Sequence, residues 1–380
     1  MTTADHDPRS ATDRTIEQDR RHRAGRTPVL PVVVATGEGA WVTDIDGRRY
    51  LDLSSSTGAL TFGHRHPALV AVAADQLTRS AFTSAAVHDD RQAGFAAALA
   101  ELAGGDSVLS VDSGDEAMDV ALRAAAARAQ RDAAPASVVV AAGSHEPLVA
   151  SGARTVPFGD AGALADALDD ATAAVVLEPV QAGAGVVAAP AGYLAAAREL
   201  CAERGVTLIV DETRSGLGRS GSTFAMGPGD GVPDIRLLGP ALGGGIVPSA
   251  AVVGTRELLR DVSATASGSA LAAAIGQRVV EMLGTGEIQT RAAALAEHLR
   301  GRLDALPGTG VTAVRTAGVW AGVDIDPAVG SATDIARRLV ARGVLVESVG
   351  PATIVLSPPL VIRATELDWA IEQLRVVLAS

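Results

Sequence analysis

The stretch from Leu208 to Gly245, LIVDETRSGLGRSGSTFAMGPGDGVPDIRLLGPALGGG, contains the densest pattern in the chain. It begins with a short apolar run that ends in two carboxylates, Asp211 and Glu212, and continues into a glycine-rich loop. A second apolar run ends in Gly239, Pro240 and a run of glycines. Open α/β sheets bind their ligands beyond the carboxyl ends of their strands. The pattern therefore predicts a ligand site around Asp211.

Apolar runs alternate with helix-like stretches on both sides of this segment. Such alternation is typical of a mostly parallel sheet with helices on both faces. The helix-like stretches include an Ala-rich region over 68–104 and a helix that opens at Asp112 and continues to about Arg131. The runs predicted as strands are 107–111, 137–142, 173–177, 206–210, 235–238 and 250–253, and 288–380 returns to a mixture of helices and strands.

The composition is that of a soluble globular chain, with 380 residues of which 48% are hydrophobic and 20% charged. This length predicts two domains. The net charge of -12, with no basic stripe, argues against a nucleic-acid partner. No apolar run approaches the roughly 20 residues of a membrane span, and the first residues lack the apolar stretch of a signal peptide, so we expect none. The single cysteine, Cys201, suits a reducing cytoplasm and is expected to be a buried structural thiol.

Several short motifs resemble those of one known family. They are WVTDIDGRRYLDL at 41–53, GHRHP at 63–67, LEPVQ at 177–181, GLGRSG at 216–221, VPDI at 232–235 and ALGGG at 241–245. Together with Asp211 and Glu212 they resemble the class III (ω-type) aminotransferases, which use pyridoxal phosphate. The likeness covers nearly the whole chain after about residue 28. In that family GHxHP is a turn before a helix, which favours a structural role for the two histidines over a metal site.

The resemblance implies a fold, a division into domains and an assembly. The fold is α/β, the type-I pyridoxal-phosphate aminotransferase architecture, with a mostly parallel sheet in a large domain and a small α/β domain built from both termini. The expected ranges are a flexible arm over 1–27, the small domain over 28–78 and 288–380, and the large domain with the cofactor cleft over 79–287. The family's cleft lies at the interface of a homodimer, and Thr265 falls where the family gives a threonine to the partner subunit's phosphate site.

One position departs sharply from the family. Lys and Arg together number 32, and every one of them is Arg. The family's lysine, which holds the cofactor as a Schiff base, stands before ALGGG, where this chain has Pro240. A lysine Schiff base cannot form in a chain without lysine. We therefore expect no pyridoxal phosphate cofactor, and no metal.

The phosphate turn and the ring stack of the family are altered as well. The turn is Ser113-Gly114-Asp115, in which Asp115 either repels a phosphate or caps the following helix. Ser144 stands where the family stacks an aromatic ring on the cofactor, and Glu146 stands where it has glycine, with His145 between them. These changes weaken the expected binding of pyridoxal phosphate.

The remaining pocket positions are partly retained. Asp211 matches the carboxylate that pairs with the pyridinium nitrogen, and Glu178 matches the glutamate of the family's E-P-V/I-Q turn. Thr213 replaces the family's Val, Arg214 replaces its Gln, and Val355 replaces an Arg that clamps substrate carboxylates in many members. Arg214 is expected to pair with Asp211 or Asp115, or to bind a substrate.

Three hypotheses follow for function. The first is a repurposed enzyme of bacterial specialised metabolism that is independent of pyridoxal phosphate, acts on a small and anionic substrate, and uses His145, Glu146, Asp211 and Arg214 for acid/base chemistry. The second is a non-catalytic partner or regulator of an active relative. The third is a protein that holds pyridoxal or pyridoxamine phosphate non-covalently. A co-purified relative would favour the second, and a yellow colour the third.

Overall fold

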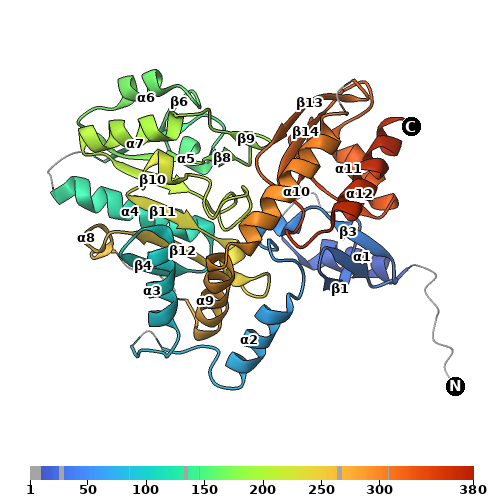
Figure 1. Cartoon of the computed structure of the whole chain (residues 1–380), viewed down its shortest axis with the longest axis horizontal. Coiled ribbons are helices and arrows are strands. Elements are labelled where there is room, and N and C mark those ends of the chain that lie inside the picture. Colours follow the sequence, from blue (N-terminus) through green and yellow to red (C-terminus); the bar gives the residue numbers. More distant parts are fainter. Residues whose placement is uncertain are drawn as a thin grey trace.

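The structure is a computed structural model that describes residues 10–24, 30–84, 86–131, 136–144, 146–262, 268–306 and 308–380. Figure 1 shows a large sheet with its helices in one half of the molecule. The first strands and the last helices of the chain lie together in the other half, and α10 (Glu287–Leu303) runs between the two.

The large sheet has seven strands in the order β4-β12-β11-β10-β7-β5-β6. Neighbouring strands from β11 to β6 are parallel, whereas β12 runs antiparallel to both of its neighbours. Every residue of β7, β10, β11 and β12 is buried, which explains why these strands are continuous apolar runs. The bounds are β4 Ser107–Val111, β5 Ser137–Ala141, β6 Arg154–Val156, β7 Thr172–Leu177, β10 Thr207–Asp211, β11 Ile235–Leu238 and β12 Ala250–Gly254.

Helices cover both faces of this sheet. Successive strand residues point to opposite faces, and both faces of the central strands are apolar and buried. On one face, α4 (Gly114–Arg131) packs its alanines against Val176 and Ile209. On the other, α7 (Tyr193–Arg204) packs against Val175 and Leu208. The other helices of this half are α2 Pro67–Leu77, α3 Gln92–Ala103, α5 Glu146–Ala150, α6 Ala161–Ala167, α8 Arg256–Leu259 and α9 Ala270–Gly284, with 3-10 turns at Ser55–Gly58, Pro228–Asp230 and Pro240–Gly243.

Two four-stranded sheets are built from the two ends of the chain, and β8 and β9 form a separate two-stranded sheet. Of the four-stranded sheets, one has the order β1-β2-β3-β15 and the other β13-β14-β17-β16. β15 pairs in parallel with β3, so a C-terminal strand completes the N-terminal sheet. The bounds are β1 Val34–Glu38, β2 Trp41–Asp44, β3 Arg49–Asp52, β8 Val180–Gln181, β9 Val187–Ala188, β13 Val311–Thr316, β14 Ala321–Ile325, β15 Val344–Leu345, β16 Glu347–Val349 and β17 Thr353–Leu356, with α1 Ala11–His22, α11 Ala332–Ala341 and α12 Ala364–Leu378.

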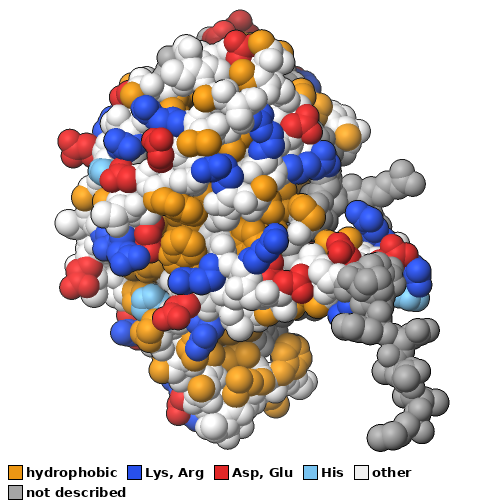
Figure 2. Space-filling view, turned by 90° about the vertical axis from the view of Figure 1, so that its right-hand side faces the viewer, with side chains coloured by type: hydrophobic (Ala, Val, Ile, Leu, Met, Phe, Trp, Pro, Cys, Tyr) orange, Lys and Arg blue, Asp and Glu red, His pale blue; other side chains and the backbone are white. Residues whose placement is uncertain are grey.

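The surface of the molecule mixes charges of both signs. On the face shown in Figure 2, Arg side chains alternate with Asp and Glu, and apolar side chains fill the spaces between them. None of the described helices combines the length and apolar character needed to cross a bilayer.

The strands predicted from apolar runs are confirmed to within about a residue, and Cys201 is fully buried, so burial raises the pKa of its thiol to about 12. The helical region expected over 68–104 contains two helices, α2 and α3, and the described residues between them are not helical. That segment contains Ser80, Asp89 and Asp90, which favour turns over helix. The proposed division into domains stays a prediction.

Candidate functional site

The candidate site lies at the carboxyl edge of the large sheet. Asp211 is the last residue of β10, Ser113 and Gly114 follow β4, and Gly239 follows β11. These strands point the same way, so the three loops emerge at one edge. Ligands of open α/β sheets bind at this edge.

Thr213 joins these loops physically. A Cβ built on Gly114 would lie 3.2 Å from the Cγ2 of Thr213, and one built on Gly239 would lie 3.3 Å from the same methyl group. The backbone N–H of Thr213 donates to Oδ1 of Asp211 at 2.8 Å, and its hydroxyl donates to the same oxygen at 2.6 Å. Asp211 is 6% exposed. The sequence therefore places a fixed, buried carboxylate beside the start of α4 and the residue before Pro240.

The first turn of α4 is capped by Ser113. Its Oγ accepts from the backbone N–H of Glu116 at 3.1 Å, and Oε2 of Glu116 accepts from the N–H of Asp112, the residue before the cap, at 3.1 Å. Asp115 is exposed in this turn. The interpretation of Asp115 as the cap is therefore wrong, because the preceding serine already fills that role.

Polar side chains of the loops after β5 and β7 make hydrogen bonds to the backbone. Ser144 is 2% exposed and its hydroxyl donates to the carbonyl of Ala141 at 2.6 Å. Gln181 donates to the carbonyl of Ala142 at 2.8 Å. Oε2 of Glu178 accepts from the N–H of Ala182 at 3.3 Å. His145, Thr265 and the side chain of Glu146 lie outside the described part of the chain.

Arg214 has a different partner from the one expected. Its Nη2 lies 3.4 Å from Oε2 of Glu347, the first residue of β16, and its guanidinium carbon lies 5.6 Å from the ring centre of Trp320. The prediction of an ion pair with Asp211 or Asp115 is corrected by this contact. Asp211 and Glu178 are still near enough to act on Arg214 electrostatically. Glu347 was missed, although it is the one charged residue in the apolar run 344–349.

A second ion pair missed in the sequence lies directly behind the site. Glu212 is fully buried, and its carboxylate contacts Arg236 and accepts from the backbone N–H groups of Ala225 and Met226. Burial raises the pKa of Glu212, against the opposing effect of Arg236. The pair fixes the loop between β10 and β11 beneath the site.

Arg219 ties the same loop to the smaller sheets. It is 1% exposed, and it donates to the carbonyls of Val319 and Pro358 and to the hydroxyl of Thr61. Burial lowers the pKa of this guanidinium to about 10. Both halves of the molecule are therefore connected at the candidate site.

The histidine motif is structural in geometry. Nε2 of His64 lies 2.8 Å from Oδ2 of Asp52, and among the described residues no three His, Cys, Asp or Glu side chains gather in the manner of a metal site. Two surface hollows of about 900 and 550 Å³ meet at the start of α10, around Glu287 and Arg291. Neither is lined by the residues of the carboxyl edge, so the loops and not the hollows define the site.

A family model described as "Aminotransferase class-III" matches residues 23–146 and 154–378. The chain belongs to the class-III aminotransferase family. It is 32% identical to ornithine aminotransferase of Bacillus subtilis, over 98% of this chain and 99% of that protein. It is 36% identical to ornithine aminotransferase of Bordetella pertussis, over 92% of each chain.

Solved structures agree with this family assignment. Ornithine δ-aminotransferase of Plasmodium falciparum superposes with a TM-score of 0.90 at 28% identity, over 97% of this chain and 98% of that one. Acetylornithine aminotransferase of Elizabethkingia anophelis superposes with a TM-score of 0.89 at 28% identity, over 97% and 99%. The predicted α/β aminotransferase fold is thus confirmed.

These relatives overturn three expectations. A repurposed enzyme independent of pyridoxal phosphate, a non-catalytic protein and the lack of a cofactor were inferred from the altered pocket. Proteins similar over their whole length are nevertheless named ornithine aminotransferases, and the solved Toxoplasma gondii enzyme is described with pyridoxal phosphate at its active site. The absence of lysine remains a fact of the sequence. What is wrong is the step from that absence to an abandoned chemistry, because the similarity extends over the entire fold.

Proposed function

We propose that this protein is an aminotransferase that acts on small amino acids of the ornithine or acetylornithine type and uses pyridoxal phosphate. The similarity to ornithine aminotransferases over nearly the whole chain carries the proposal. The retained geometry at Asp211 supports it, since a buried carboxylate at the end of β10 is the group expected to pair with the pyridinium nitrogen.

The residues of the site fit one part of the cofactor and not another. Gly114 and Gly239 let the start of α4 and the residue after β11 pack closely against Thr213, so both lie near Asp211. The N–H groups at a helix start attract a phosphate. The covalent attachment does not fit, because Pro240 stands at the family's lysine position and the chain has no lysine. We propose that the chain is a divergent member that lacks this lysine and holds the cofactor by non-covalent contacts.

The chain's own residues then have limited and definite roles. When bound, pyridoxal phosphate supplies an electron-withdrawing ring that stabilises negative charge on the substrate carbon. Asp211, fixed by two hydrogen bonds from Thr213, would favour a protonated ring nitrogen through its negative charge. Arg214 would bind an acidic group. His145 and Glu146 stay candidates for proton transfer, with Ser113, Gly114, Asp115, Ser144, Glu178 and Pro240 around the cofactor.

The finer properties of the assembly also belong to the proposal. We place the protein in the cytoplasm as a homodimer with the cleft at the subunit interface, where Thr265 would reach the partner's site. The small domain would comprise 28–78 and 288–380, and the large domain 79–287. A role in biosynthesis fits the amino acid substrates of its relatives.

The decisive experiment uses the purified chain with added cofactor. The protein is incubated with pyridoxamine phosphate and 2-oxoglutarate, and separately with pyridoxal phosphate and ornithine or acetylornithine. Glutamate formation and amine loss are followed by mass spectrometry against a cofactor-only blank. We expect turnover above the blank, increased by a small primary amine such as methylamine, which can replace the missing side-chain amine. Turnover equal to the blank with and without methylamine would overturn the proposal.

A further inference from the structure

Arg214 lies where separate parts of the chain meet. It follows β10 of the large sheet, it faces Glu347 of β16, and its guanidinium lies over Trp320, which precedes β14. Thr57, in the turn at Ser55–Gly58, also binds Glu347. The cation therefore lies beside Asp211 where the large sheet meets the sheet β13-β14-β17-β16, and its partner Glu347 also contacts the turn at Ser55–Gly58.

The ion pair at this junction is poorly made. A single N···O distance of 3.4 Å joins Arg214 to Glu347, and the Nε of Arg214 is buried without a hydrogen-bond partner in the part of the chain that is described. Burial lowers the pKa of Arg214 although Glu347, Glu178 and Asp211 act against this. Burial raises the pKa of Glu347 although Arg214 and Thr57 act against this. For each charged group, the free-energy cost of desolvation thus exceeds the stabilisation by its ion-pair partner.

A second ion pair of similar side-chain exposure has a better contact geometry. Arg315 and Asp324, on β13 and β14, are 29% and 24% exposed, close to the 28% and 26% of Arg214 and Glu347. Their contact is two-pronged, at 2.5 and 2.6 Å, and the Nε of Arg315 donates to the carbonyl of Gly185. The hydrogen bonds between them raise the pKa of Arg315 and lower the pKa of Asp324. The pair at the site therefore has a poorer contact than a pair of similar side-chain exposure, and its surroundings desolvate it more strongly.

The geometry points to an anion that completes the site. We propose that Arg214 is the receptor for an acidic group, a carboxylate or a phosphate monoester, of the small molecule bound at the carboxyl edge, and that this group takes the place of Glu347 on the guanidinium. The planar guanidinium matches both oxyanions with paired hydrogen bonds. The proposal rests on the proposed function for the place of the ligand, and it names the residue that recognises its charge.

Trp320 provides a direct readout. Of the three tryptophans, Trp41 and Trp369 pack against each other, with ring centres 5.7 Å apart, and both can be changed to Phe so that Trp320 alone reports. In this background we titrate inorganic phosphate and glutarate, and follow Trp320 fluorescence. We expect a saturable change that Arg214→Gln weakens at least tenfold in Kd, and that Glu347→Gln strengthens severalfold, because the competing carboxylate is gone.

The matched control is Arg315→Gln, which removes a cation of equal exposure away from the site and should leave both titrations unchanged. Far-ultraviolet circular dichroism checks that each variant is folded. The opposite effects of Arg214→Gln and Glu347→Gln separate a receptor from a merely structural pair, for which neither change would alter anion binding. Unchanged anion binding in Arg214→Gln, or no binding of either anion to the wild type, would overturn the proposal.

Calorimetry distinguishes the two sources of the anion. If Arg214 receives the cofactor phosphate, Arg214→Gln weakens pyridoxamine phosphate and leaves pyridoxamine unchanged. If it receives the substrate carboxylate, Arg214→Gln weakens 2-oxoglutarate and leaves pyridoxamine phosphate unchanged. Both outcomes support the receptor. Anion binding that depends on Arg214 in a protein without turnover would refute the proposed function and leave this inference standing.

Discussion

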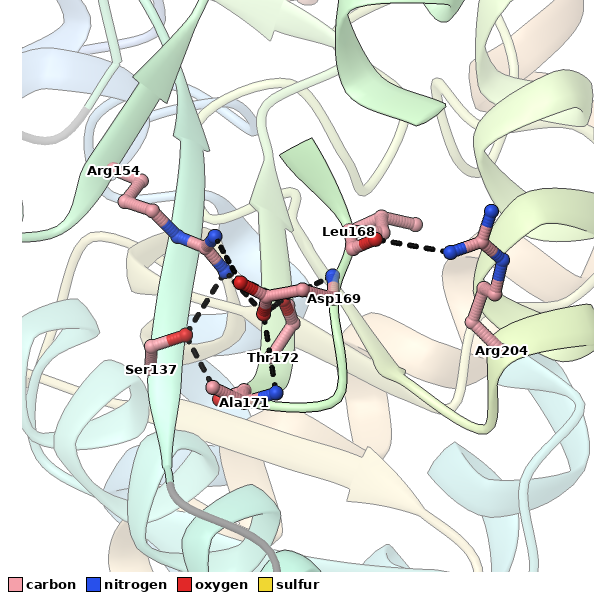
Figure 3. Close-up of polar contacts among 7 residues, drawn as sticks. All are labelled: Ser137, Arg154, Leu168, Asp169, Ala171, Thr172 and Arg204. Carbon is pink, nitrogen blue, oxygen red and sulfur yellow. Dashed lines mark hydrogen bonds and ion pairs between the residues drawn. The ribbon is translucent and has the colours of Figure 1, made fainter. Parts of the chain in front are cut away.

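The two edges of the seven-stranded sheet carry their charges in opposite ways. At the amino edge, Arg154 opens β6 and donates to Asp169, Thr172 and Ser137, as Figure 3 shows. Asp169 also accepts from the N–H of Ala171 and the hydroxyl of Thr172, so the carboxylate is surrounded by donors. Hydrogen bonds from Arg154 and Thr172 lower the pKa of Asp169.

At the carboxyl edge, Arg214 and Glu347 are more buried and less well paired. Burial lowers the pKa of Arg214 and raises the pKa of Glu347, and both shifts favour the neutral form. At the amino edge the exposed carboxylate of Asp169 is thus well paired, although the Nε of Arg154 is buried without a hydrogen-bond partner in the described part of the chain. The carboxyl edge keeps a charge whose satisfaction requires something further, which is the condition expected of a binding site.

The largest effect should come from returning a lysine to the carboxyl edge. Gly239 touches Thr213, which is bonded to Asp211, so a side chain at 240 starts beside the site. With pyridoxal phosphate and borohydride, Pro240→Lys should gain a covalent cofactor adduct at residue 240, near one per chain, whereas the wild type has no lysine to label. Peptide mass mapping locates the adduct.

Arg154→Lys is the control for this experiment, because it places a lysine at the amino edge. Equal labelling of the two lysines would mean that the carboxyl edge offers the cofactor nothing beyond an accessible amine. That result would count against a retained cofactor site.

The next effect concerns stability. Arg236→Met removes the cation that faces fully buried Glu212, and stranding a buried charge costs about 3 to 5 kcal/mol. Arg154→Met at the amino edge breaks an ion pair with the solvent-exposed Asp169 and should cost much less than Arg236→Met. Urea denaturation measures both free energies of unfolding. Similar losses of unfolding free energy in the two variants would show that the buried ion pair contributes no more to stability than the exposed one.

The sequence was enough to predict a site at the carboxyl edge of the sheet. It was not enough to predict which charged residues form ion pairs there. Apolar runs fixed β7, β10 and β11, and the carboxylate after β10 marked the site, because both features are local in the chain. Glu347 lies 133 residues from Arg214, and no local pattern links them. Arg236 is hidden for the same reason, since a charge inside an apolar strand reveals its partner only after the strands align.

Residue substitutions also proved a weaker guide to chemistry than the overall fold. Pro240, Ser144 and Arg214 differ from the family pattern, and that difference suggested an abandoned reaction. The relatives that match along the whole chain are ornithine aminotransferases. A pocket pattern reports on individual contacts, whereas similarity of the whole chain reports on the entire arrangement that positions a substrate.

A smaller effect is expected at the start of α4. Ser113→Ala removes the hydroxyl that accepts from Glu116, and loss of such a cap costs about 1 kcal/mol. Ser10→Ala removes the equivalent cap of α1, a helix with no buried residue, and should not change global unfolding. Urea denaturation compares the two. A larger loss from Ser10→Ala than from Ser113→Ala would refute the expected link between capping at the site and global stability.

The smallest effect is in pH dependence, where the two edges should differ in sign. Burial raises the pKa of Glu347, which faces Arg214, Thr57 and Asp52. The folded state then binds this proton more tightly than the unfolded state does. The contribution of Glu347 to stability is therefore fully present below the ordinary glutamate pKa and is lost as pH rises through the raised value.

Asp169 behaves in the opposite way, because its pKa is lowered by Arg154. Its contribution is present above the ordinary aspartate pKa and is lost as pH falls. The stability difference between wild type and Glu347→Gln should therefore fall with increasing pH, and the difference between wild type and Asp169→Asn should rise. Unfolding free energies from about pH 3 to about pH 7 cover both ordinary values. If both stability differences changed with pH in the same direction, Glu347 would be fully stabilised by Arg214. Arg214 would then already be neutralised without a ligand.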